Sequence, residues 1–139
     1  MLDNVIDISH RNTAASFQEV KNNGIVGVIH KATEGITVVD SEYHGRKHRA
    51  LANGLFGGAY HFGVKGNVEQ QVEHFLAAVN PTATDLLVLD FEPNGISGKM
   101  TLAEAETFVS AVKAKTGRFP GLYSGESFLR EKVGSNTHV

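Results

Sequence analysis

Short apolar runs alternate along the chain with longer segments in which apolar residues recur every three or four positions. The short runs are rich in β-branched residues and are typical of strands, whereas the longer spacing is typical of amphipathic helices. The expected strands cover residues 5–8, 25–31, 55–62, 86–91 and 121–123. The two clearest helical patterns lie within residues 68–79 and 102–112. This alternation predicts an α/β fold with a parallel sheet.

Local signals mark where helical segments begin and end. Thr101 and Glu104 have the spacing of a capping box at the start of the second helix. Gly24 and Gly54 follow two earlier segments, where a glycine suits a left-handed C-cap. These positions predict one helix start and two helix ends.

Length and composition limit the possibilities further. The chain has 139 residues, 41% of them hydrophobic, which suits one globular domain. Its 13 basic and 15 acidic residues give a net charge of -2 without long runs of either sign, so no nucleic-acid footprint is indicated. The absence of cysteine excludes a disulfide framework and a thiolate nucleophile.

No stretch of the sequence resembles a membrane span or a leader. The start lacks the basic and apolar regions of a signal peptide. No apolar run approaches the roughly 20 residues that a bilayer-spanning helix needs. We therefore expect a protein made in the cytoplasm without a signal peptide and without a membrane partner.

Two carboxylates stand one residue apart at the end of the fourth apolar run. Because strand side chains alternate between faces, Asp90 and Glu92 should share one face while Phe91 packs behind the strand. Carboxylates this close perturb each other, so that one can keep a proton while the other stays charged, as glycoside hydrolysis requires. The alternative is a pair of solvated acids before a turn at residues 93–95.

Other side chains capable of chemistry also stand at or next to the ends of predicted strands. In a parallel α/β fold the carboxyl ends of the strands converge on one rim, where barrel enzymes carry their active sites. Each residue has an ordinary alternative as a turn cap, a solvated charge or a half-buried core residue, but the coincidence recurs in all five strands. The residues are Asp7, Lys31, Tyr60, His61, Asp90, Glu92 and Tyr123.

Two further patterns favour structural roles. His44 and His48 have the spacing of a helical zinc pair, but Gly45 stands where the zinc-protease motif has glutamate. We interpret both histidines as part of a solvated helix face and expect no metal site. The glycines between residues 54 and 63 match neither phosphate-binding spacing, so strand packing is the simpler use.

Four motifs occur in order along the chain. They are Asp7-Ile8-Ser9, Lys31-Ala32-Thr33-Glu34-Gly35, Gly58-Ala59-Tyr60-His61-Phe62 and Leu89-Asp90-Phe91-Glu92. Together they resemble the glycoside hydrolase family 25 lysozymes, the Chalaropsis-type muramidases. The resemblance covers essentially the whole chain.

This resemblance implies a TIM-like α/β barrel and cleavage of the β-1,4 bond between N-acetylmuramic acid and N-acetylglucosamine in peptidoglycan, without a metal or organic cofactor. It implies that Glu92 is the general acid, that Asp90 orients the substrate's acetamido group or a water, and that Asp7 assists. To donate a proton near neutral pH, Glu92 must retain it, which burial or the charges of Asp90 and Asp7 would favour. The implied substrate-binding residues are Tyr60, His61, Tyr123, Lys31 and Glu34.

The chain also departs from the family pattern. The family barrel has five βα units and three further strands, whereas this sequence reaches only the fifth strand and residues 126–133, which could start the next helix. We therefore expect a C-terminally incomplete catalytic-type domain over residues 1–133 and a flexible tail over residues 134–139. His10-Arg11-Asn12 stands where the family often has a different polar run that shapes the sugar site.

An incomplete barrel leaves three hypotheses open. The chain could be an active muramidase that acts on the cell wall, released in the manner of a phage endolysin. It could instead be an impaired remnant that only binds peptidoglycan. It could also be an interaction protein, in which a homodimer or another chain covers the open barrel edge.

Overall fold

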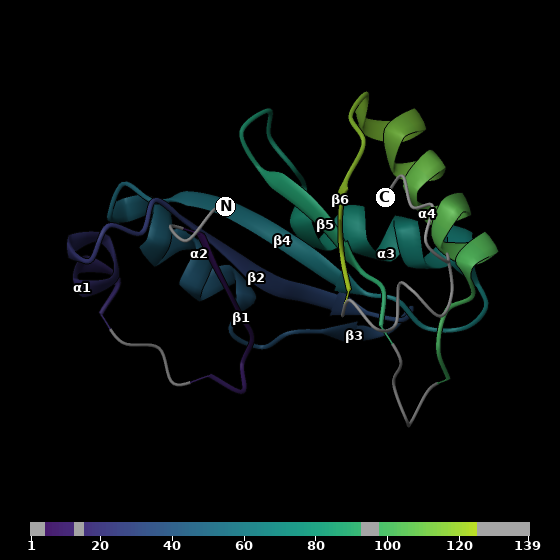
Figure 1. The fold of residues 1–139 in the computed structure, drawn as a ribbon, viewed down its shortest axis with the longest axis horizontal. Helices are drawn as coiled ribbons and strands as arrows, with labels where there is room; N and C mark the ends of the chain where they lie inside the picture. The colour runs from purple at the N-terminus through teal and green to yellow at the C-terminus, as the bar shows by residue number, and fades with distance from the viewer. Residues whose placement is uncertain (1–4, 13–15, 93–97, 125–139) are drawn as a thin grey trace.

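The computed structural model describes residues 5–12, 16–92 and 98–124, and its centre is a curled parallel sheet (Figure 1). The strand order is β1-β2-β4-β5-β6, with every neighbouring pair parallel. A short strand, β3, pairs antiparallel with the end of β2. The bounds are β1 Val5–Ile8, β2 Gly27–Glu34, β3 Val38–Val39, β4 Phe56–Phe62, β5 Leu86–Asp90 and β6 Gly121–Tyr123.

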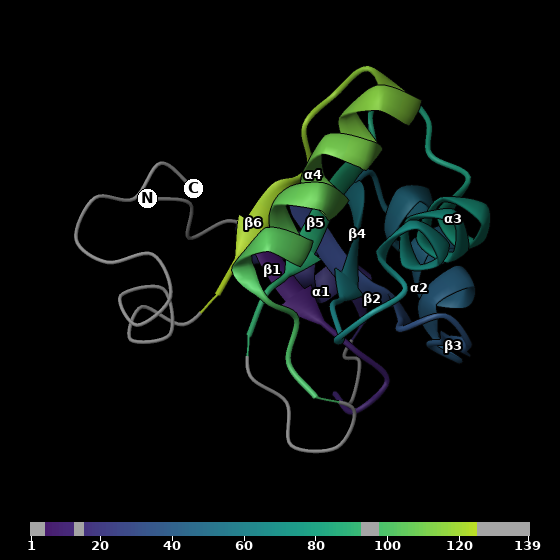
Figure 2. The same cartoon turned by 90° about the vertical axis from the view of Figure 1, so that its right-hand side faces the viewer.

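Helices connect the parallel strands and cover one side of the sheet. Figure 2 shows α2, α3 and α4 along this side, with β6 turned away from α2 and α3. The bounds are α1 Phe17–Asn22, α2 Tyr43–Ala52, α3 Val68–Val79 and α4 Leu102–Thr116. The predicted α/β fold is therefore confirmed, and the described residues form part of a curled (β/α) barrel.

The structure confirms the predicted strands and the predicted helix ends. All five expected strands are present, although the second begins at Gly27 and continues to Glu34. Thr101 and Glu104 form the predicted capping box of α4, and Gly24 and Gly54 follow α1 and α2 with φ of 88° and 75°. The sequence patterns did not identify β3, whose two residues are too few to show a period.

The main core lies between the sheet and helices α3 and α4. Alternate residues of β5 supply its centre, because Leu87 and Leu89 point toward the helices and are buried there. Phe91 follows in the same direction and is fully buried, as predicted. A smaller cluster under α1 and α2 consists of Phe17, Val28, Ala50 and Leu55.

The other face of the sheet is concave and holds the pocket described below. Gly58 of β4 allows the neighbouring side chains to pack closely, since a Cβ at this position would meet the Leu86 Cβ at 3.0 Å and the Ile29 Cγ1 at 3.1 Å. Strands β1 and β6 are the two edges of the sheet in the described residues. In the same part of the chain, no helix is long and apolar enough to cross a membrane.

Three expectations lie outside the described residues. These are the turn at residues 93–95, the helix start within residues 126–133 and the flexible tail at residues 134–139. The division of the chain into residues 1–133 and 134–139 stays a prediction.

Candidate active site

A pocket of about 390 Å³ opens on the concave face of the sheet. Its walls come from all five parallel strands and the residues that directly follow them, so segments far apart in the sequence meet there. The lining residues are Asp7, Ile29, Tyr60, Val88, Asp90, Glu92, Gly121, Leu122 and Tyr123. Five of the predicted site residues are thus brought together: Asp7, Tyr60, Asp90, Glu92 and Tyr123.

The alternation of side chains along β5 explains why two acids reach this pocket. Val88, Asp90 and Glu92 line it, whereas the residues between them point into the core. Asp90 is only 7% exposed, and Glu92 is less buried. The predicted shared face of the two carboxylates is therefore present in the structure.

The environment of Asp90 favours its protonated form. Burial, a hydrogen bond with Glu92 and the negative charges of Glu92 and Asp7 raise the pKa of Asp90 to about 8. Two carboxyl groups can share a hydrogen bond only if one of them carries a proton. The pair therefore holds a proton at neutral pH.

Two tyrosines complete the polar part of the pocket. Burial and then the charges of Asp90 and Asp7 raise the pKa of Tyr60. The pKa of Tyr123 is raised as well, mainly by the charge of Asp7, although its side chain is half exposed. Both phenols stay neutral near pH 7 and can donate hydrogen bonds to a polar ligand.

Lys31 and Glu34 lie near the pocket but are not among its lining residues. Lys31 Nζ is 2.6 Å from Glu34 Oε1 and 5.3 Å from the centroid of the Phe62 ring. Its positive charge opposes the other influences on Asp90 and lowers the pKa of that group. The structure thus gives Lys31 an electrostatic connection to the pocket and pairs it with Glu34.

His61 does not line the pocket, which corrects the expectation from the sequence. It follows Tyr60 directly in β4, so its side chain points to the opposite face and is fully buried. Its Nδ1 is 2.7 Å from Thr33 Oγ1, its Nε2 is 2.8 Å from Gln71 Oε1, and its ring stacks on Phe108. Burial lowers its pKa to about 4, so His61 is a neutral core histidine.

The sequence profile described as "Glycosyl hydrolases family 25" matches residues 6–139. The chain belongs to this family. It is 28% identical over 141 residues to the N,O-diacetylmuramidase of Arthroderma benhamiae, a match that covers 93% of this chain and 60% of that protein. The chain thus spans about 60% of the length of this curated relative.

Solved structures of a muramidase and of a family GH25 lysozyme share the fold. The muramidase from Acremonium alcalophilum is 26% identical with a TM-score of 0.84, and the match covers 94% of this chain and 69% of that one. The family GH25 lysozyme from Aspergillus fumigatus is also 26% identical, with a TM-score of 0.82, over 92% of this chain and 68% of that one. These similarities confirm the resemblance seen in the four sequence motifs.

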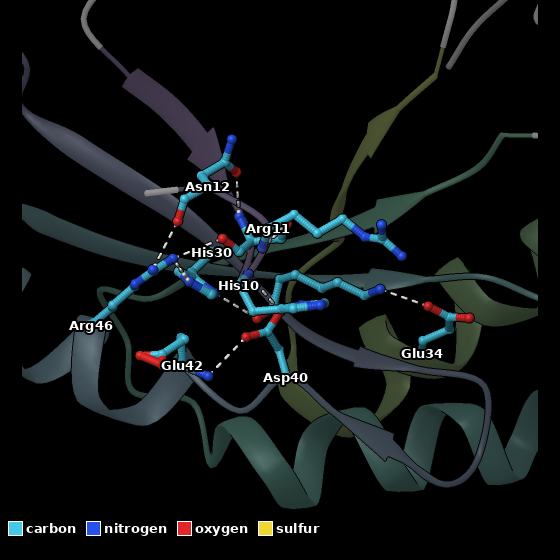
Figure 3. A network of polar contacts seen from close by, with 10 residues as sticks. His10, Arg11, Asn12, His30, Glu34, Asp40, Glu42 and Arg46 are labelled. Atoms are coloured by element: carbon cyan, nitrogen blue, oxygen red, sulfur yellow. Dashed lines mark hydrogen bonds and ion pairs between the residues drawn. The ribbon is translucent and has the colours of Figure 1, made fainter. Parts of the chain in front are cut away.

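A polar network beside the family 25 pocket was not predicted (Figure 3). It centres on Asp40 and Arg46, both buried, and joins the loop after β1 to β2 and α2. No local pattern singles out these residues, because their partners in the loop after β1 lie 30 to 37 positions away along the chain. The unusual residues His10 and Arg11 were the one sequence signal at this place.

Metal coordination has no evident site in the described parts of the chain. There, no three histidine, aspartate or glutamate side chains are arranged to hold a metal ion. His44 and His48 are both exposed on α2.

Proposed function

We propose that this chain is a muramidase that hydrolyses the β-1,4 bond between N-acetylmuramic acid and N-acetylglucosamine in peptidoglycan. The observation that carries the proposal is the raised pKa of Asp90 beside Glu92, in a pocket that can admit a sugar. Membership of family 25 and the names of the relatives support the same reaction class.

The proton held by the carboxyl pair is the one that the reaction needs. Glu92 is the less buried member, so it faces the substrate and delivers this proton to the glycosidic oxygen as the bond from that oxygen to the sugar carbon breaks. Water adds to the sugar carbon and releases a proton, which restores the pair. Water is the only co-reactant in this scheme.

The remaining polar residues bind and orient the substrate. Asp90 orients the acetamido group or a water, while the charge of Asp7 favours the positive character that develops on the sugar ring. Tyr60 and Tyr123 donate hydrogen bonds to the sugar or its acetamido group. Lys31, which is paired with Glu34, offsets part of the negative charge of the pocket carboxylates.

The proposal also covers where the protein acts and which chains it associates with. A peptidoglycan substrate places the reaction at the cell wall. Within the part of the chain that the structure describes, strands β1 and β6 are edges that a second copy or another chain could cover, because an unpaired strand edge favours strand addition.

The decisive experiment identifies the new sugar end. Purified peptidoglycan is digested with the protein, the new reducing ends are reduced with borohydride, and the hydrolysed sugars are analysed. A muramidase produces muramitol in proportion to time and protein. New glucosaminitol without muramitol, or no new reducing ends, would contradict the proposed function.

A further inference from the structure

A fully buried network of polar side chains joins strands β2 and β4 to helix α3. It consists of Thr33, His61 and Gln71, which are connected in this order by hydrogen bonds. The register between β2 and β4 shifts between Lys31 and Thr33, so that Lys31 pairs with Tyr60 and Thr33 pairs with His61. The shift brings a hydroxyl group to His61 inside the core.

The main chain of the loop after β4 determines the direction of each hydrogen bond. Gln71 Oε1 accepts from the Val64 N–H at 3.2 Å, and Gln71 Nε2 donates to Val64 O at 2.8 Å and to Gly66 O at 2.5 Å. Only this orientation of the amide satisfies the loop, so His61 must donate from Nε2 to Gln71 Oε1. Because burial keeps His61 neutral, its Nδ1 accepts from the Thr33 hydroxyl. Gln71 thus holds the loop with its oxygen and with its nitrogen.

The same loop contacts the end of β5 that carries the first acid. The N–H of Gly63 donates to Asp90 O at 3.1 Å. Gly63 directly precedes Val64, whose N–H and carbonyl are both bound by Gln71. A shift of the loop away from Gln71 would therefore move the main chain of Asp90.

The loop also contacts the chain on the other side of Glu92. Val64 and Lys99 form an antiparallel bridge, and the Lys65 N–H donates to Gly98 O at 3.3 Å. Together with the bond to the end of β5, these contacts hold the main chain on both sides of Glu92. The buried network is thus connected through one short loop to the segment that bears both acids of the pair.

The carboxyl pair depends on this placement because its two members share a hydrogen bond. Hydrogen bonds weaken steeply when their geometry is poor. A displacement of about 1 Å that originates far from the reacting atoms can lower a rate on the order of 10²-fold. We propose that His61 and Gln71 are positioning residues that hold Asp90 and Glu92 in their paired arrangement through the loop at residues 63–66.

The substitution Gln71→Met tests this role, since methionine fills a similar space but cannot hold the loop by hydrogen bonds. The kcat for soluble peptidoglycan fragments should fall on the order of tenfold, while KM stays within about twofold because the pocket tyrosines are unchanged. The kinetic measurement rests on the proposed function. A carboxyl-carbon NMR titration needs no substrate, and the midpoint of Asp90 should fall from about 8 by about one pH unit as the hydrogen bond to Glu92 is lost.

The control Val79→Ala separates positioning from a general loss of stability. Val79 is the last residue of α3 and is buried in the main core, so its truncation weakens packing in the same helix. Urea unfolding compares the stability of the two variants. Val79→Ala should keep the kcat and the Asp90 midpoint of the parent protein.

The milder variant His61→Phe serves if Gln71→Met does not fold. Phenylalanine keeps a ring against Phe108 but cannot donate to Gln71, so both readouts should change in the same direction and by less. A parent-like value of either readout in the folded variant, or an equal change in Val79→Ala, would overturn the positioning role. A parent protein that hydrolyses no peptidoglycan contradicts the proposed function alone, and the titration then decides the positioning role by itself.

Discussion

Replacing Glu92 with glutamine is expected to lower the rate of peptidoglycan hydrolysis by about 10²- to 10⁴-fold, the usual contribution of a general acid. Glutamine keeps the size and a hydrogen bond to Asp90, but it cannot deliver a proton to the glycosidic oxygen. The rate of reducing-end release should therefore fall while the fold is retained. Initial rates at saturating peptidoglycan measure the effect.

The control for this variant is Glu106→Gln, on the exposed surface of α4. It removes the same charge from the protein and should leave the rate within about twofold of the parent. A Glu92→Gln protein that hydrolyses peptidoglycan at the parent rate would remove Glu92 from the catalytic role.

Replacing Asp90 with asparagine is expected to have opposite effects on activity and on stability. Asparagine cannot share a proton with Glu92, so we expect hydrolysis to fall by about 10²-fold or more. The folded pKa of about 8 lies above the ordinary value of 3.8, so the folded protein binds more protons than the unfolded chain between these values. The free energy of unfolding therefore decreases as pH rises through this window.

Asparagine removes this penalty because it has no proton to lose. Relative to the parent, Asp90→Asn should gain on the order of a few kcal/mol of stability between pH 4 and pH 9. Urea unfolding at several pH values measures the difference, and Glu73→Gln on the exposed side of α3 is the matched control. A stability difference that stays constant over this pH range would show that Asp90 ionises normally in the folded protein.

The parts of the site that sequence predicted well depend on local periodicity. The alternation Leu89-Asp90-Phe91-Glu92 determined which side chains face the pocket, and the structure places them so. Parallel topology then brought Asp7 and Tyr123, from the two edge strands, to the same cavity. Both steps follow from backbone geometry, which short sequence patterns express directly.

Two parts of the site were not predicted correctly. One depends on the alternation of side chains along a strand, and the other on contacts between residues far apart in the sequence. Tyr60 and His61 are neighbours in a strand, so only one of them could face the pocket, and His61 packs in the core instead. Asp40 and Arg46 were missed because their roles depend on partners in the β1 loop. Such contacts exist only once the sheet has formed.

The sequence also could not show how deeply Asp90 and Glu92 are buried. Glu92 was expected to keep the proton, whereas the structure raises the pKa of Asp90. Asp90 is the last residue of β5 and is shielded by the sheet, while Glu92 lies beyond the strand and is more accessible. In the proposed mechanism the proton therefore belongs to the pair, and Glu92, as the more exposed member, is proposed to deliver it.

The most direct test of the account is a carboxyl-carbon NMR titration of the protein labelled at its aspartate and glutamate side chains. We expect one carboxyl signal with a midpoint near pH 8, which disappears in Asp90→Asn. That result would establish a pocket that holds a proton at neutral pH, the property on which the proposed hydrolysis depends. If every carboxyl group titrated below about pH 5, as ordinary aspartate and glutamate do, the proposed acid would have no proton to give.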